Sequence, residues 1–405
     1  MHSVRRLAAP LLLLPVLAGC AVVVPLGGQA QGALASVIRG ADPEPMDIKN
    51  AGTGSGSIVS AETMPNLPLP VRMSGVQAAR VVYRSVQPGV GEREVSGTVF
   101  TPSGDAPEGG WPVISYAHGT TGIEQACAPS RFASLLGASA LVQGYTTAGF
   151  AVAITDYEGL GHEGSHAYLD NITAGYDVID AVRALRNVFP DVGTEWAAFG
   201  GSQGGGAAWA ANELADSYAP ELDLVGAVAL APAANMVGLV DKAIAGTLTD
   251  DQGPLLQWVL ESLARRDPSL NLDDYRRGDA AQDWAALTGC TPDKAGARED
   301  AVKRLGDKDF APKSDAAADA LRQALARMAV PQGPASEPML VAYGDADTYI
   351  DAAWTDAALE QACAFGDVIT IDRQAGRGHG DVNGDAVNQW IADRFAGVPA
   401  QNDCS

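Results

Sequence analysis

A serine between glycines is the residue best placed to do chemistry in this chain. Gly200, Ser202 and Gly204 form the pattern G-x-S-x-G, with a short apolar run before it and an alanine-rich helical run after it. This context is typical of a nucleophile elbow, where the serine lies on a strained turn between a strand and a helix. Such strain costs about 1–3 kcal/mol and is retained mainly at functional sites. The pattern therefore predicts a nucleophile at Ser202.

The glycine-rich stretch could also arise by chance or bind a dinucleotide. The bare pattern recurs by chance in chains rich in glycine and alanine, so its partner residues must decide. A dinucleotide-binding loop would follow the first strand of its domain, whereas this stretch follows about four strand candidates. The position along the chain thus favours the elbow.

A serine hydroxyl needs a neighbouring base to take its proton, and that base needs an orienting acid. His379 is the candidate base, because it lies between glycines in a loop after the last strand candidate. Asp347 is the candidate acid, with Asp345 and Asp351 as competitors in the same loop. A calcium loop is the alternative for this aspartate cluster, but the expected glycine and final glutamate are missing. The chain order Ser, Asp, His is that of α/β-hydrolases.

Acyl transfer also needs backbone N–H groups that face the developing oxyanion. The N–H of Gln203, at the start of the elbow helix, is one candidate. The second is expected from Thr120, with Thr121 as the alternative, in the loop after a buried strand. His118 in that loop is expected to order the loop and not to act as a second base. The sequence has no metal-ligand spacing, so we expect neither a metal nor a cofactor.

The elements that must position these residues alternate along the chain. Segments 80–85 and 93–100 alternate with period two and predict an antiparallel hairpin at a sheet edge. Buried strands are predicted at 111–117, 150–155, 224–230, 338–343 and 368–371, with helices at 131–148, 171–189, 352–363 and 382–395. This alternation predicts an α/β fold with a mostly parallel, twisted sheet that is flanked by helices. Ligands of such sheets bind at the carboxyl ends of the strands, where the loops of His118, Asp156 and Ser202 are expected to meet.

The alternation stops between the two halves of the predicted core. Residues 231–333 are helical in pattern, for example over 255–265 and 316–328. We expect the following organisation: signal peptide 1–19, tether and N-terminal arm 20–70, core 71–232, helical lid or cap insertion 233–335, and second core segment 336–405.

The N-terminal residues indicate export. Arg5 and Arg6 precede a short apolar run that ends in Leu-Ala-Gly-Cys at Cys20. The run is too short for a mature membrane helix and is typical of a secretory signal. Its ending is similar to a bacterial lipobox, which predicts lipidation of Cys20; the alternative is an ordinary signal peptide with an incidental cysteine.

Composition and cysteine number narrow the functions further. A net charge of −22 over 405 residues argues against binding nucleic acid, which requires a basic face. Without Cys20, four cysteines remain. In an oxidising compartment they allow three pairings, or they stay as four free thiols.

Several motifs together resemble the secretory lipase family, the lipase A-like esterases of fungi and bacteria. They are Tyr116-Ala117-His118-Gly119, Cys127-Ala128-Pro129-Ser130, Asp156-Tyr157-Glu158-Gly159-Leu160-Gly161, the Ser202 elbow and the loops of Asp347 and His379. The resemblance implies an α/β-hydrolase fold, a triad of Ser202, Asp347 and His379, a helical lid, and cofactor-free hydrolysis of lipid esters. It also implies the disulfides Cys127–Cys290 and Cys363–Cys404. The lipobox and the His118-Gly119 loop depart from the fungal pattern and leave the preferred acyl-chain length open.

We therefore expect an exported serine lipase or esterase that is held at the cell envelope through Cys20, or secreted, and acts on lipid or other esters as a monomer. A peptidase or aminoacyl hydrolase on the same fold is the first alternative. A non-catalytic envelope lipoprotein is the second.

Overall fold

Nine strands form one sheet in the computed structural model, which describes residues 42–404. Their order across the sheet is β1-β2-β3-β5-β4-β6-β7-β8-β9. The pairs β1–β2, β2–β3 and β3–β5 are antiparallel, and all pairs from β5 across the sheet to β9 are parallel. Their bounds are β1 Ile58–Thr63, β2 Gln77–Gln87, β3 Gly91–Thr101, β4 Trp111–Ala117, β5 Ala151–Thr155, β6 Val192–Gly201, β7 Asp223–Leu230, β8 Met339–Gly344 and β9 Ile369–Gln374. The mostly parallel α/β sheet is confirmed.

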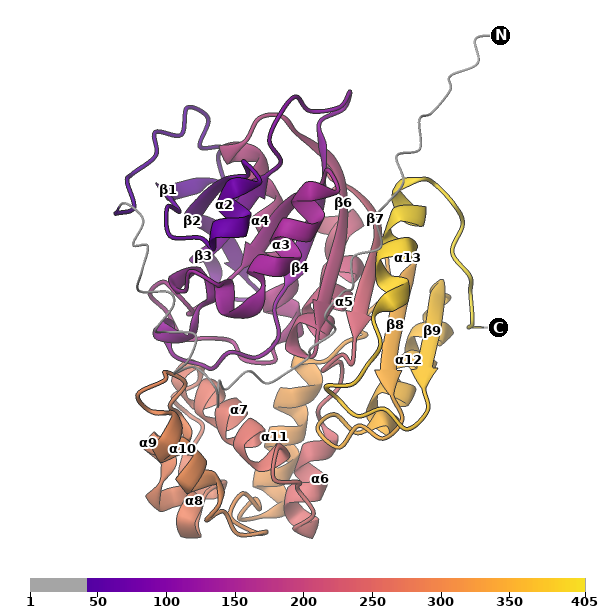
Figure 1. The fold of residues 1–405 in the computed structure, drawn as a ribbon. Coiled ribbons are helices and arrows are strands. Elements are labelled where there is room, and N and C mark those ends of the chain that lie inside the picture. The colour runs from indigo at the N-terminus through magenta and orange to yellow at the C-terminus, as the bar shows by residue number, and fades with distance from the viewer. Residues whose placement is uncertain (1–41, 405) are drawn as a thin grey trace.

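Helices cover both faces of this sheet (Figure 1). The face that packs against α4 (Asn171–Val188), α5 (Gln203–Tyr218) and α12 (Ala352–Phe365) holds the largest hydrophobic cluster. The other face packs against α2 (Leu69–Met73), α3 (Ser139–Thr147) and α13 (Asp385–Phe395). Because both faces are buried, β5 has no exposed residue and is a nearly continuous apolar run, as expected for an inner strand.

A separate layer of helices lies between β7 and β8 in the chain. Figure 1 shows this layer below the carboxyl ends of the parallel strands. It has its own hydrophobic cluster, which includes Leu256, Val259, Leu321 and Leu325. We call α6 to α11 the cap helices; their bounds are α6 Gly238–Ala245, α7 Gln252–Arg266, α8 Gly278–Gln282, α9 Trp284–Leu287, α10 Ala295–Val302 and α11 Asp315–Met328.

Two details of the predicted elements were wrong. The β2–β3 hairpin is not at the sheet edge, because β1 pairs with the outer side of β2. The sequence of β1 lacks a period-two pattern, since only two of its six side chains, Ile58 and Ala61, are buried. The helix expected at 131–148 also begins late, at Ser139. Short 3-10 turns precede it, and Leu135 and Leu136 have left-handed backbone angles (φ 51° for each) that an α-helix does not accept.

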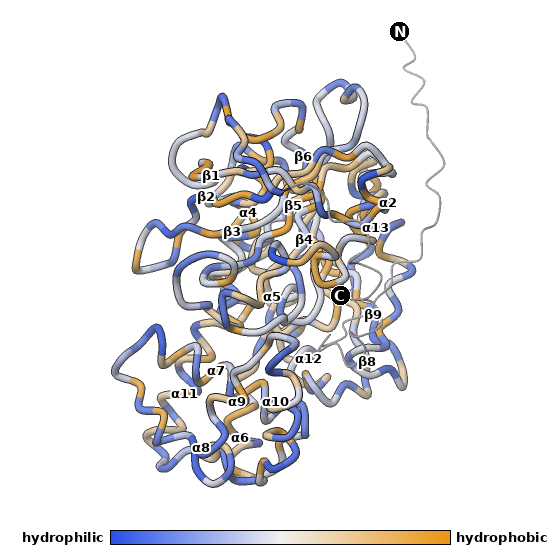
Figure 2. Tube along the Cα trace, turned by 60° about the vertical axis from the view of Figure 1, so that its left-hand side comes forward, coloured by the Kyte–Doolittle hydropathy of each residue, from blue (hydrophilic) through white to orange (hydrophobic). Residues whose placement is uncertain are grey.

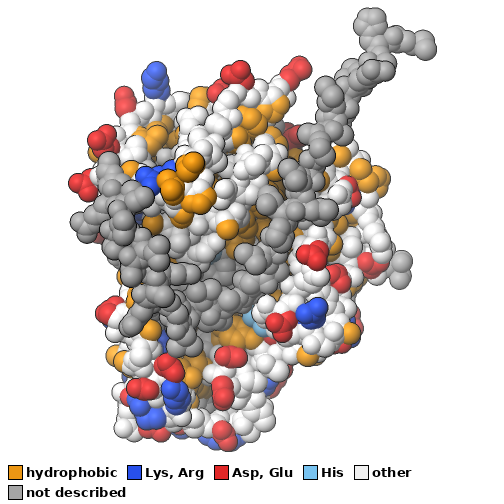
Figure 3. All heavy atoms as spheres, in the orientation of Figure 1, with side chains coloured by type: hydrophobic (Ala, Val, Ile, Leu, Met, Phe, Trp, Pro, Cys, Tyr) orange, Lys and Arg blue, Asp and Glu red, His pale blue; other side chains and the backbone are white. Residues whose placement is uncertain are grey.

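Polarity follows this layered arrangement. The hydropathy colouring in Figure 2 shows apolar segments along the strands in the interior of the molecule. Acidic side chains are scattered over the face drawn in Figure 3, in keeping with the excess of 49 acidic over 27 basic residues. Within residues 42–404, no helix is both long and apolar enough to cross a membrane. The expected signal peptide and Cys20 lie outside the described residues.

Candidate active site

The turn that carries Ser202 has the geometry of a nucleophile elbow. Ser202 stands between β6 and α5 with φ 57° and ψ −120°, a conformation that L-residues rarely adopt. A β-carbon on Gly200 would lie 2.2 Å from the carbonyl oxygen of Gly204. The Ser202 N–H donates to the carbonyl oxygen of Leu230 (2.8 Å), which holds the turn against the next strand. The glycines thus allow two backbone segments to approach where side chains would collide.

Ser202, His379 and Asp347 form one hydrogen-bonded chain. The Oγ of Ser202 lies 3.0 Å from Nε2 of His379, and Nδ1 of His379 lies 2.7 Å from Oδ2 of Asp347. Because the carboxylate accepts, Nδ1 carries the ring proton and Nε2 can accept from the serine hydroxyl. The ring of Tyr349 packs on the imidazole, with 4.9 Å between ring centroids. Residues 177 positions apart are therefore brought into the arrangement that acyl transfer requires.

Asp347 is fixed by the backbone of its own loop. Its Oδ1 accepts the N–H groups of Tyr349 (2.8 Å) and Ile350 (3.0 Å), so only Oδ2 faces the histidine. The loops of the acid and the base meet at Gly344, where a β-carbon would lie 2.0 Å from the carbonyl oxygen of Arg377. Two hydrogen-bonding groups and a close backbone contact thus set the position of the carboxylate.

The two competing aspartates are engaged elsewhere. Asp345 accepts the N–H of Gly376 (2.6 Å), and Asp351 makes an ion pair with Lys242 of α6 (3.0 Å). Among the described residues, neither contacts His379. The structure therefore places Asp347, and not Asp345 or Asp351, beside the imidazole.

One expected oxyanion donor directly follows Ser202 in the chain, and the other lies in a loop that passes close to Ser202. Gln203 is the first residue of α5, and Thr120 follows Gly119, whose β-carbon would stand 4.0 Å from that of Ser202. Within residues 42–404, neither the N–H of Gln203 nor that of Thr120 donates to another group. His118 is buried and its Nδ1 donates to the Gly119 carbonyl oxygen (2.6 Å), so it contacts the loop backbone and not Ser202. Desolvation by burial lowers the pKa of His118.

The four described cysteines form the two disulfides that the family resemblance implies. Cys127 is bonded to Cys290, which ties the segment after the Thr120 loop to the cap. Cys363 is bonded to Cys404, which ties the end of α12 to the C-terminal tail. Among residues 42–404, no cluster of three or more histidine, cysteine or acidic side chains is arranged to hold a metal ion.

Three residues near the site were missed from the sequence. They are Tyr349 on the imidazole and, in the loop after β5, His166 beside Gln203 and Tyr168 beside Thr120. For His166 and Tyr168, the one feature of the sequence that could have pointed to the site is that both follow a parallel strand whose carboxyl end faces it.

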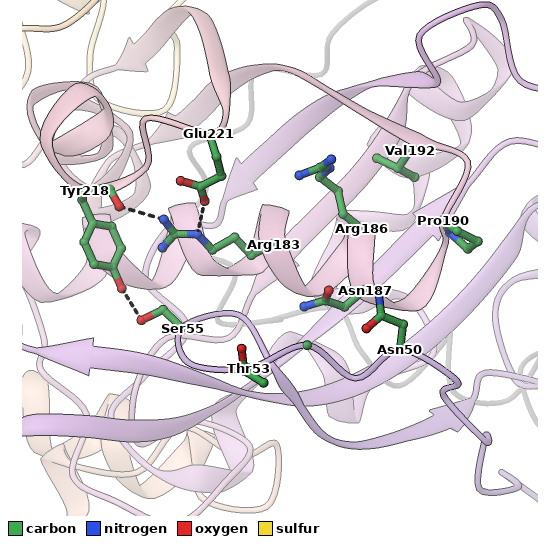
Figure 4. Close-up of a pocket in the computed structure, with 11 residues that line it drawn as sticks. Asn50, Thr53, Ser55, Arg183, Arg186, Asn187, Pro190, Val192, Tyr218 and Glu221 are labelled. Atoms are coloured by element: carbon green, nitrogen blue, oxygen red, sulfur yellow. Dashed lines mark hydrogen bonds and ion pairs between the residues drawn. The ribbon is translucent and has the colours of Figure 1, made fainter.

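A polar groove of about 630 Å³ lies away from this site (Figure 4). It is lined by the end of α4, by residues 50–55 and by Val192 at the amino end of β6. Arg183 in this groove is paired with Glu221 (2.7 Å) and donates to the carbonyl oxygen of Tyr218. The groove therefore lies at the opposite end of β6 from Ser202.

Fold and site together define an α/β-hydrolase. A model of the secretory lipase family matches residues 136–403, and the chain belongs to that family. A Mycobacterium tuberculosis protein named "Probable inactive lipase" is 28% identical over 351 residues, which is 80% of this chain and 75% of that protein. Candida antarctica lipase A in its closed state has a similar fold (TM-score 0.70, 18% identity, 87% of this chain and 85% of that chain). So does the rice cell wall degrading esterase LipA from Xanthomonas oryzae (TM-score 0.65, 19% identity, 85% and 97%).

The family and the disulfides identify an exported hydrolase of the lipase and esterase type. Because one relative is named as probably inactive, it matters whether this chain has all three candidate catalytic side chains. In this chain, the serine, histidine and aspartate are all present and hydrogen-bonded to one another.

Proposed function

We propose that this protein is a serine esterase that hydrolyses carboxylic esters of lipids through an acyl-enzyme on Ser202. The observation that carries the proposal is the hydrogen-bonded chain from Ser202 Oγ through both nitrogens of His379 to Asp347. The family and the fold of lipase neighbours support a lipid ester as substrate.

The reaction uses these groups in two halves. Ser202 Oγ attacks the ester carbonyl carbon as its proton passes to Nε2 of His379, and Asp347 stabilises the imidazolium that forms. The N–H groups of Gln203 and Thr120 stabilise the negative oxygen of the tetrahedral intermediate. His379 then protonates the leaving alcohol oxygen, which gives the acyl-enzyme. A water molecule, deprotonated by His379, attacks the acyl carbon and releases the carboxylic acid and free Ser202.

We further propose that the cap helices form a lid over the acyl site. Ser202 is only 6% exposed, and the His379 side chain is 9% exposed. Hydrophobic side chains gather in Figure 3 where the core meets the cap, which suits an acyl chain. Lipidation of Cys20, outside the described residues, would hold the enzyme near lipid substrates; mass spectrometry of the mature N-terminus tests it.

Hydrolysis of p-nitrophenyl esters from acetate to palmitate tests the proposal, with wild type compared to Ser202→Ala. We expect wild-type turnover and a loss of about 10⁴-fold or more in the variant. Activity that rises with chain length supports a lid that encloses an acyl tunnel, and activity confined to short esters supports a small pocket. Absence of turnover, together with no labelling by a fluorophosphonate probe, would overturn the proposal in favour of a non-catalytic protein.

A further inference from the structure

A three-residue segment in the loop after β5 contacts both proposed oxyanion residues. His166, Ala167 and Tyr168 are at most 4% exposed. We call them the His166–Tyr168 segment. It lies between the Ser202 elbow and cap helix α7.

His166 holds the side chain of Gln203. Its Nδ1 donates to the carbonyl oxygen of Glu158 (2.9 Å), so Nε2 is unprotonated and accepts from Nε2 of Gln203 (3.1 Å). Desolvation by burial lowers the pKa of His166 to about 3, which keeps the ring neutral. Among described residues this is the only hydrogen bond of the Gln203 side chain, because its Oε1 is buried without a partner.

Tyr168 holds the side chain of Thr120. The Tyr168 hydroxyl lies 3.0 Å from Oγ1 of Thr120, and Tyr168 is fully buried. The same short segment therefore contacts the side chains of both residues whose backbone N–H groups are the proposed oxyanion donors. A displacement of the segment would move both proposed donors together.

The cap contacts this segment through Ser262 and Trp258 of α7. Ser262 of α7 donates from Oγ to the carbonyl oxygen of His166 (2.5 Å) and accepts the N–H of Tyr168 (3.0 Å). Trp258, one turn earlier in α7, packs edge-on against Tyr168 with 5.9 Å between ring centroids. These contacts seat α7 directly on the segment that touches Gln203 and Thr120.

We infer that His166, Tyr168 and Ser262 are positioning residues that couple the seating of cap helix α7 to the alignment of the oxyanion donors. This inference rests on the proposed function. It predicts that loss of the contacts impairs stabilisation of the tetrahedral intermediate and leaves binding of the ester unchanged. Interactions made only in the transition state lower kcat and not KM when they are removed.

Tyr168→Phe in the full-length protein tests the inference, with p-nitrophenyl butyrate as substrate. Tyr275→Phe is the matched control, because its buried hydroxyl donates to the Ala317 carbonyl oxygen in the cap, outside the proposed coupling. Complete loss of one oxyanion donor costs about 10²–10³-fold, so a misaligned donor should lower kcat about 10-fold in Tyr168→Phe. KM should stay within about 2-fold, and inhibition by phenylethylboronic acid, which forms a tetrahedral adduct, should weaken in parallel with kcat.

Thr120→Val removes the partner hydroxyl and keeps the backbone N–H, so it provides a second route to the same answer if Tyr168→Phe does not fold. The Tyr168 hydroxyl also hydrogen-bonds Tyr349, so Tyr168→Phe removes two contacts and Thr120→Val removes only the shared one. The double variant should therefore lose no more activity than Tyr168→Phe alone, because the Thr120 contact is already absent in that variant. Ser262→Ala should show the same split between kcat and KM. If Tyr168→Phe and Thr120→Val turn over as fast as Tyr275→Phe, the inference is overturned while the esterase proposal stands. A wild type without turnover or fluorophosphonate labelling overturns both.

Discussion

The carbonyl oxygen of Ala117 occupies the place where a β-carbon on Gly204 would have to lie, because the two atoms would be only 1.9 Å apart. Ala117 ends β4 and Gly204 lies in the first turn of α5, so this contact sets how closely the elbow helix approaches the neighbouring strand. Neither backbone segment can move without disturbing Ser202.

Gly204→Ala should therefore destabilise the fold by more than about 3 kcal/mol, beyond the usual range for overpacking, and abolish esterase activity. Gly296→Ala is the matched control, since Gly296 lies within α10 and a β-carbon there meets nothing within 4 Å. The control should be neutral or up to about 1 kcal/mol more stable. Urea unfolding measures both, and a Gly204→Ala protein as stable as wild type would contradict the packing argument.

Asp347→Asn should lower kcat about 10⁴-fold, because an amide no longer holds His379 in the required tautomer. Asp345→Asn and Asp351→Asn are the controls, since their carboxylates bind Gly376 and Lys242 instead. Each control should retain activity within about 10-fold of wild type. Steady-state kinetics on p-nitrophenyl butyrate decides between them, and an equal loss in Asp351→Asn would refute the assignment of the acid.

His166 should make the protein less stable as the pH falls below about 6.5. The pKa of its ring is lowered to about 3 in the folded state by desolvation, whereas the unfolded chain has the ordinary value of 6.5. Between these two values only the unfolded state takes up a proton, so the free energy of unfolding falls by about 1.4 kcal/mol for each pH unit. Above pH 6.5 the ring is neutral in both states and contributes no slope.

Comparison with His166→Gln isolates this effect. Burial raises the pKa of Asp180 to about 6 and that of Glu213 to about 7, and these carboxyl groups act in the opposite direction, because the folded state holds their protons. The difference between wild type and His166→Gln removes their contribution. Urea unfolding at pH 7.5, 6.0 and 5.0 gives the free energy of unfolding of both proteins. The value for wild type minus that for His166→Gln should fall as the pH is lowered. A difference that does not change with pH would rule out a buried neutral histidine.

The two disulfides should contribute unequally to stability. Cys127–Cys290 closes a separation of 163 residues and Cys363–Cys404 one of 41. Chain-entropy arguments give the longer loop an advantage of about 1 kcal/mol, within a usual range of about 2–5 kcal/mol for each bond. Replacement of both cysteines by serine, pair by pair, followed by urea unfolding, tests this. Equal losses would mean that native-state contacts outweigh chain entropy.

Loss of the Cys127–Cys290 bond should also lower esterase activity more than loss of the Cys363–Cys404 bond. The bond of Cys127 to Cys290 joins the cap to the segment after the Thr120 loop, so its loss should lower kcat. Loss of the bond between α12 and the tail should not, because Cys363 and Cys404 lie outside the proposed catalytic contacts.

Some features of this protein could be predicted from local patterns. The glycines around Ser202 and the run of strands and helices depend on residues that are close in sequence. The elbow, the parallel sheet and the chain order Ser, Asp, His were therefore predictable. Short or irregular segments were not: β1 has only two buried side chains, and the 3-10 turns before α3 depend on positive backbone angles at Leu135 and Leu136.

By itself, the sequence determined which loops carry the candidate nucleophile, base and acid, because strand–turn–helix signals are local. Only the tertiary structure decided which aspartate faces His379, since Asp347 and its competitors lie within a few residues of one another and differ in long-range partners. The same holds for the contacts of the His166–Tyr168 segment with Gln203 and Thr120, which join the β5 loop to α5, the β4 loop and a cap helix. Contacts between segments that are far apart in sequence leave no periodic pattern in it, so they can be recognised only in the tertiary structure.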